Sequence, residues 1–119
     1  MNYLSSAEDQ VHVDASKRDW GDHDVDAHLE YHRAFFSKIP RSFDIVVDAT
    51  RLPYVAITHI AFFRALCAFA REHMKDRLRT CRIVGAPYVM TCIYRAFATT
   101  GLIAEHTLGK ITFESKQKE

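Results

Sequence analysis

The stretch that decides the predicted fold is Thr80-Cys81-Arg82-Ile83-Val84-Gly85-Ala86-Pro87-Tyr88. It begins as a strand that ends in β-branched residues, and it then turns into a helix. Pro87 marks the start of that helix, because the amide proton that proline lacks has no partner in a first helical turn. Apolar residues recur at three- and four-residue spacing as far as Phe97, and Gly101 follows as a residue that ends helices. The helix is therefore expected over residues 87–99.

A second apolar run follows this helix at Ile111-Thr112-Phe113. Strands joined by a crossover helix pair in parallel, so the two runs predict an α/β unit. Residues 43–47 form a nearly continuous apolar run, as expected for a central strand that helices cover on both faces. We predict a single small α/β domain with a mostly parallel sheet of about four strands and three main helices.

Two more helices are expected upstream of this unit. One spans residues 25–38, where apolar residues share one stripe, with Asp22 or Asp24 as its cap and Pro40 at its end. The other, which is the longest helix, spans roughly residues 57–75.

The composition indicates one folded domain. The 119 residues suffice for a single core, and apolar and charged fractions of 48% and 26% are ordinary for a globular protein. No run approaches the ~20 apolar residues of a membrane span. Residues 1–5 carry no targeting signal, so an intracellular chain, cytoplasmic by default, is expected. We divide it into a mobile N-terminus over 1–10, a domain over 11–113 and a polar tail over 114–119.

The sequence predicts neither a metal nor another cofactor. His28 and His32 lie at i, i+4 on one helix face and are the residues best spaced to bind one metal. The acidic residues around them have another explanation, because the helix dipole favours carboxylates in the first turn. The three cysteines are an odd number inside apolar patterns, and we expect them to be buried reduced thiols. They are Cys67, Cys81 and Cys92.

No catalytic constellation is found in the sequence. It lacks a Gly-rich phosphate loop, a paired-carboxylate arrangement, and any Ser/His/Asp or Cys/His spacing typical of a nucleophilic enzyme. The formal net charge of +1 and the lack of an interleaved Arg and aromatic repeat give nucleic-acid binding no support. We expect a protein that is not an enzyme and does not bind nucleic acid.

Polar residues directly after the expected central strand form the first candidate ligand site. Asp48, Thr50 and Arg51 stand at its carboxyl end, which is the edge where ligands usually bind in open α/β sheets. The alternative is structural, with Asp48 only accepting hydrogen bonds from loop amides.

The helix over 57–75 has an apolar face wider than packing on one sheet demands. We assign one of its stripes to the sheet: Ile57, Ile60, Phe63, Cys67, Ala70 and Met74. Phe62, Leu66 and Phe69 form a second row beside it. Monomers rarely expose such a patch, so an apolar ligand, a partner chain or the N-terminal segment should cover this row.

Basic residues gather around the end of the same helix. Arg71, Lys75 and Arg79 either offset the helix dipole or form a phosphate or headgroup site. The sequence leaves both interpretations open.

The stretch from Ile83 to Tyr88, the apolar helix and the pair Lys110-Ile111 resemble the end of the CRAL-TRIO lipid-binding domain. In that family a strand leads into Asn-Ala-Pro-aromatic, and Gly85 replaces the Asn here. The family's helix ends near Leu-x-x-x-Thr-x-x-Lys-Ile, a pattern similar to Leu102, Thr107 and the Lys-Ile pair.

Earlier residues fall in the same family order. Asp19-Trp20 precedes an acidic helix, and residues 43–48 match the family's apolar strand that ends in Asp. The resemblance covers roughly residues 11–113, and it places the first strand of the domain at Val11-His12-Val13.

The resemblance implies a non-catalytic module with a cavity for a hydrophobic ligand such as a phospholipid, and at most peripheral contact with a membrane surface. The family continues after the position of Phe113 into a helix that gates the pocket, and it has a helical N-terminal lobe. Counterparts of both are missing here, so we expect a reduced version of such a domain.

The alternative is a structural or interaction subunit of a larger assembly. In that case another protein chain covers the apolar face of the helix over 57–75. STAS-like domains, which are similar in strand and helix order, work through such contacts. Their regulatory pattern has a phosphorylatable serine about where Ile57 stands, with Thr58 beside it, and this mismatch argues against a phospho-switch.

Overall fold

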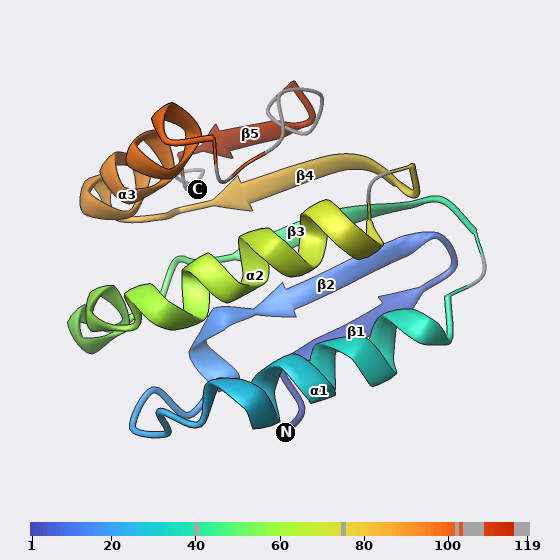
Figure 1. Ribbon diagram of the computed structural model, residues 1–119, viewed down its shortest axis with the longest axis horizontal. Coiled ribbons are helices and arrows are strands. Elements are labelled where there is room, and N and C mark those ends of the chain that lie inside the picture. The colour runs from blue at the N-terminus through green and yellow to red at the C-terminus, as the bar shows by residue number, and fades with distance from the viewer. Residues whose placement is uncertain (40, 75, 102, 104–108, 116–119) are drawn as a thin grey trace.

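Five strands form one sheet in the order β1-β2-β3-β4-β5 (Figure 1). The computed structural model describes every residue except 40, 75, 102, 104–108 and 116–119. The first strand pairs antiparallel with the second, and all the other neighbours pair in parallel. The strands are β1 (Leu4–Ala7), β2 (Gln10–Asp14), β3 (Phe43–Asp48), β4 (Leu78–Val84) and β5 (Ile111–Glu114).

Three α-helices connect the parallel strands, which confirms the predicted α/β class: α1 (Val25–Ser37), α2 (Ile60–His73) and α3 (Tyr88–Thr99). Two short 3-10 helices, η1 (Ala15–Lys17) and η2 (Tyr54–Thr58), precede α1 and α2. None of the described helices is long and apolar enough to cross a membrane.

The helix boundaries follow local signals in the sequence. Asp24 caps α1, as one of the two expected caps, because its Oδ1 accepts a hydrogen bond from the Ala27 amide at 3.1 Å. Pro87 occupies the cap position of α3, one residue before the first helical residue. The second helix begins later than predicted, because residues 54–58 form η2 instead of its first turn.

The N-terminus differs from the prediction. No regular element was expected before residue 11, yet Leu4–Ala7 forms β1 and Tyr3 is buried. The Leu4 amide donates a hydrogen bond to the Tyr31 hydroxyl at 3.0 Å, which joins this strand to α1. The sequence pattern was too short to reveal an edge strand of four residues, three of them exposed.

All three α-helices cover the same face of the sheet (Figure 1). Each parallel strand lies directly beside the preceding one, and crossovers of one hand place consecutive helices on one face. The expectation that helices cover β3 on both faces is therefore wrong. Phe43 and Ile45 are buried against the helices, whereas Asp44 and Val46 point to the other face and are only half-buried.

Polar side chains occupy the open face of the sheet. Asp44 accepts hydrogen bonds from the Thr80 hydroxyl at 2.7 Å and from Arg79 Nη2 at 3.1 Å. Arg82 pairs with Glu114 on the next strand through two hydrogen bonds of 2.5 and 2.9 Å. These cross-strand pairs let the face remain in water without a further layer.

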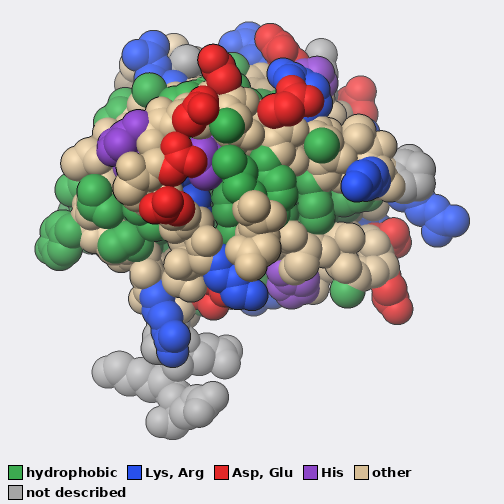
Figure 2. Space-filling view, turned by 90° about the horizontal axis from the view of Figure 1, so that it is seen from below, with side chains coloured by type: hydrophobic (Ala, Val, Ile, Leu, Met, Phe, Trp, Pro, Cys, Tyr) green, Lys and Arg blue, Asp and Glu red, His purple; other side chains and the backbone are tan. Residues whose placement is uncertain are grey.

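Acidic side chains mark the edge of the molecule formed by α1. Figure 2, which views the molecule from below, shows several of them gathered beside a group of hydrophobic side chains. Asp24, Asp26 and Glu30 are all exposed, as expected for a solvated helix face.

Candidate functional site

A large apolar cavity lies between the helices and the covered face of the sheet. Its volume is about 310 Å³, and its walls are almost entirely apolar. The helices contribute Phe62, Leu66 and Phe69 from α2 and Phe97 from α3, and the sheet contributes Ile45 and Ile83. Such a volume lies at the lower end of the ~300 to 1,000 Å³ typical of small-molecule sites.

The cavity exists because α3 packs loosely. None of the residues of α3 is fully buried, and one of its contacts with the sheet is the edge of Tyr94 against Phe113, with ring centroids 4.9 Å apart. The inward side chains of Cys81 and Ile111 are likewise only half-buried. The space that α3 leaves between itself, α2 and the sheet is the cavity.

A buried arginine stands in the cavity wall. Arg18 is 4% exposed, and its Cζ lies 4.4 Å from the ring centroid of Trp20 and 4.1 Å from that of Phe62. Its Nη1 donates a hydrogen bond to the Asp19 carbonyl at 3.0 Å, whereas Nε and Nη2 have no hydrogen-bond partner among the described residues. Burial lowers the pKa of Arg18, while nearby Tyr3 and the carboxylates of Asp22 and Asp19 favour its charged form.

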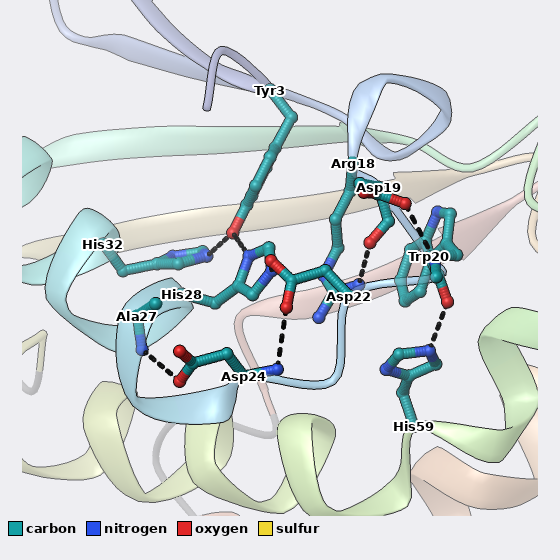
Figure 3. A network of polar contacts seen from close by, with 11 residues as sticks. Tyr3, Arg18, Asp19, Trp20, Asp22, Asp24, Ala27, His28, His32 and His59 are labelled. Carbon is teal, nitrogen blue, oxygen red and sulfur yellow. Dashed lines mark hydrogen bonds and ion pairs between the residues drawn. The ribbon is translucent and has the colours of Figure 1, made fainter.

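Beside this arginine, a network of polar side chains joins the N-terminus to α1 (Figure 3). The Tyr3 hydroxyl lies 3.0 Å from His28 Nδ1 and 3.0 Å from His32 Nε2, and all three side chains are buried. His28 Nε2 in turn lies 3.2 Å from Asp22 Oδ2, at an angle outside ordinary hydrogen-bond geometry.

The carboxylate of Asp22 determines which groups donate and which accept the hydrogen bonds of this network. It favours a proton on Nε2 of His28, so Nδ1 of that ring accepts a hydrogen bond from the Tyr3 hydroxyl. The Tyr3 oxygen then accepts one from the Nε2 proton of His32. Burial lowers the pKa of His32 to about 4 and, together with Arg18, lowers that of His28, so both rings are neutral at pH 7.

Two other histidines lie at the far side of Trp20. His59 Nε2 lies 2.8 Å from the Trp20 carbonyl oxygen, and the His59 ring stacks on His23 with centroids 4.2 Å apart. Within the described part of the chain, no three His, Cys, Asp or Glu side chains are grouped to hold a metal ion.

The predicted apolar row is brought together in the cavity wall. Phe62 and Phe69 are buried and Leu66 is half-buried, and all three line the cavity. Of the three covers expected for this row, the structure has the N-terminal segment, because Phe62 packs with Trp20 and Phe69 belongs to the same core cluster as Tyr3. The row is therefore internal, and the division of α2 into a sheet stripe and an outer stripe is wrong.

The polar residues after β3 do not reach the cavity. Asp48 Oδ1 accepts hydrogen bonds from the Thr50 amide at 3.0 Å and from the Thr50 hydroxyl at 2.6 Å, which is the structural role named as the alternative. Arg51 is exposed. The wall is formed instead by their neighbours Ala49 and Leu52, whose side chains face inward.

The predicted headgroup residues are not brought together. Arg71 borders the cavity, and its Nη1 donates a hydrogen bond to the Gly101 carbonyl at 3.3 Å. Arg79 pairs with Asp44 on the open face of the sheet. Lys75 lies outside the described residues, as do Pro40, Leu102 and Thr107.

Sequence reasoning missed Tyr3, Arg18 and His32 as residues of the cavity wall. Tyr3 and Arg18 stand in stretches without hydrophobic periodicity, so no pattern indicated their burial. The sequence did contain an indication for His32, because a histidine on the apolar stripe of a helix is expected to be buried and to need a hydrogen-bond partner.

Comparison with protein-family models, with curated proteins and with solved structures found no match. The similarity to CRAL-TRIO domains therefore stays a prediction from motifs. The structure establishes a small α/β domain with three α-helices and a five-stranded, mostly parallel sheet.

Proposed function

We propose that the chain is a non-catalytic module that binds a small hydrophobic ligand in the cavity between α2, α3 and the sheet. The supporting observation is the cavity itself, with a volume of about 310 Å³ and an apolar wall. The motifs that resemble CRAL-TRIO domains agree with a ligand of this kind.

The apolar wall of the cavity favours a resident ligand. The cavity is about half open to the surface, so part of its wall is in contact with water when no ligand is bound. A hydrophobic molecule gains about 25 cal/mol for each Å² of apolar surface that is removed from water when it binds.

The volume also limits the size of the ligand. At about 30 Å³ per water-sized group, the cavity holds roughly ten such groups. This favours a molecule with one medium-length alkyl chain over a phospholipid with both of its chains enclosed.

The side chains around the cavity do not suggest catalysis. The Tyr3 hydroxyl is held between two histidine nitrogens, and burial raises its pKa far above neutral pH. Burial also raises the pKa of the Cys81 thiol to about 12, which removes it as a nucleophile at neutral pH.

A second candidate function is that of an interaction subunit. It is favoured by aromatic side chains at the starts of η2 and α3, where Tyr54 is 88% and Tyr88 is 75% exposed. Both residues follow the carboxyl ends of neighbouring strands, so a partner chain or the surface of a membrane would contact this edge of the sheet. The row Phe62, Leu66 and Phe69 is unsuited to that role because it is internal.

Trp20 offers a direct test of ligand binding. It is the one tryptophan of the chain and it lines the cavity, so its fluorescence should change when the cavity fills. Titration with 1-decanol should change the fluorescence of Trp20 until the signal saturates. Leu66→Glu places a carboxylate in the cavity wall and should abolish the change, whereas Arg64→Glu on the exposed side of α2 should retain it.

Two results would count against the proposal. One is a folded parent chain whose fluorescence shows no saturable response to the alcohol. The other is an equal response from the Leu66→Glu variant, which would place the binding outside the cavity.

A further inference from the structure

The free edge of Arg18 is a polar feature that ligand binding in an apolar cavity does not explain. Nε and Nη2 are both buried and lack hydrogen-bond partners in the part of the chain that the structure describes, although Arg18 belongs to the cavity wall. Buried polar groups are nearly always paired, so two orphaned N–H groups on one buried side chain need a cause.

The two nitrogens lie on the same side of the guanidinium group. The N–H bond of Nε runs parallel to one N–H bond of Nη2, the one on the same side of the group. Together they form one of the two-pronged donors with which arginine binds a carboxylate through two hydrogen bonds. Nη1 is occupied by the Asp19 carbonyl oxygen. The vacant edge therefore has the shape and the charge that complement a planar anion.

The neighbours of Arg18 partly offset the free-energy cost of burying its charge, but they do not occupy the positions where Nε and Nη2 would donate hydrogen bonds. The rings of Trp20 and Phe62 face the guanidinium, which gains cation–π attraction from both. Asp19, Asp22 and Tyr3 lie close enough to favour its charge, but among the described residues none of them reaches Nε or Nη2 in ordinary hydrogen-bond geometry. A buried cation of this kind is stabilised when an anion binds with good hydrogen-bond geometry.

The geometry points to a ligand with a single alkyl chain and a carboxylate head group, in which the carboxylate pairs with Nε and Nη2 of Arg18 and the chain fills the cavity. This inference rests on the proposed function and names its ligand class as medium-chain carboxylic acids. The Phe62 ring covers one face of the guanidinium and also forms part of the cavity wall, so the edge of Arg18 and the cavity share this side chain as a neighbour.

The test compares two ligands of equal chain length, decanoic acid and 1-decanol, at pH 8, where the acid is ionised. Both are titrated into the full chain, and binding is followed by Trp20 fluorescence and by isothermal calorimetry. The parent should bind the acid at least about tenfold more tightly than the alcohol, because hydrogen bonds between charged groups are stronger than neutral ones.

Variants of Arg18 test whether this side chain causes the preference for the acid over the alcohol. Arg18→Met keeps a long side chain but removes the charge, and it should lose the preference for the acid, because an unpaired carboxylate is costly to bury. Arg18→Lys keeps the charge without the fork and should retain only a small preference for the acid. Arg64→Met, a change at an exposed position on the outer side of α2, should leave the preference of the parent unchanged.

The outcomes separate this inference from the proposed function. If the parent binds neither ligand, the proposed function fails and this inference fails with it. Equal binding of acid and alcohol by the parent overturns only the head-group assignment, and this result needs no variant to fold. A preference that survives in a folded Arg18→Met variant also overturns it, and tighter binding of decyl phosphate than of decanoic acid would replace the carboxylate with a phosphate.

Discussion

At the residue scale, the Tyr3 hydroxyl holds the N-terminus on α1. It contacts nitrogens of His28 and His32 at 3.0 Å each, and its ring lies edge-on to Tyr31 with centroids 4.9 Å apart. Because Tyr3, His28 and His32 are all buried, removal of any one of them leaves buried polar atoms without a partner.

Tyr3→Phe should destabilise the chain by about 1 to 3 kcal/mol, because it removes the hydroxyl and leaves two buried histidine nitrogens without a partner. Urea unfolding followed by circular dichroism would measure the loss. Tyr54→Phe removes a hydroxyl from a side chain that is 88% exposed and should change the stability by less than about 0.5 kcal/mol. Similar small losses for both variants would contradict the network.

The stability of the chain should fall between pH 6.5 and pH 4. His32 has a pKa of about 4 in the folded chain and 6.5 when unfolded, so in this window the unfolded chain binds more protons. The contribution of His32 is complete above pH 6.5 and is lost as the pH falls through 4. At 1.36 kcal/mol per pKa unit, it amounts to about 3 kcal/mol.

Comparison with His32→Phe isolates this effect. The ring that replaces His32 is of similar size but does not titrate, so the stability of the variant should decline less than that of the parent on going from pH 7 to pH 4. Carboxylates titrate in both proteins and cancel in the difference. Parallel pH profiles for the parent and the variant would show that His32 is not a neutral, buried ring.

At the element scale, the turn from β4 into α3 depends on Gly85. Its φ angle is +74°, and a Cβ atom at this position would lie 2.4 Å from Thr50 Cγ2. Thr50 is itself fixed by its two hydrogen bonds to Asp48, so it cannot easily move away. The loop after β3 and the turn after β4 therefore pack too closely for any other side chain.

Gly85→Ala should cost about 2 to 5 kcal/mol, as the sum of left-handed backbone strain and overpacking. Gly101→Ala is the matched control, because Gly101 has a similar φ of +78° but a Cβ atom added there would have no atom of another described residue within 4 Å. It should cost only the strain, about 1 to 2 kcal/mol. Equal losses in thermal unfolding would mean that the contact with Thr50 is unimportant.

The same position bears on the resemblance to CRAL-TRIO domains. Asn tolerates a positive φ, so the backbone alone would permit the Asn that the family has here. The approach of Thr50 would not, because Asn also has a Cβ atom.

Elements with strong local signals were predicted well, and those that depend on distant contacts were not. Pro87 and Asp24 gave the starts of α3 and α1 to within one residue. The strand at Leu4–Ala7 has no such signal, because it is defined by pairing with β2 and by the contacts of Tyr3. The apolar run of β3 suggested two covered faces, whereas the order of the strands leaves one face open.

At the scale of the whole molecule, the position of all three α-helices on one face determines where a ligand can be held. The helix layer is closely packed near α1 and loose near α3, and the cavity lies between these regions. The sequence indicated part of this site through the surplus of apolar residues on α2. It did not indicate Arg18, because a single arginine in a polar loop gives no sign that folding will bury it.

Native mass spectrometry of the folded chain mixed with decanoic acid tests the central claim most directly, because it reports bound ligand and oligomeric state together. We predict a monomer that carries one molecule of the acid, and a Leu66→Glu variant that remains a folded monomer but carries none. A parent chain that binds no acid, or a variant that binds as much as the parent, would contradict the claim that the cavity is a ligand site.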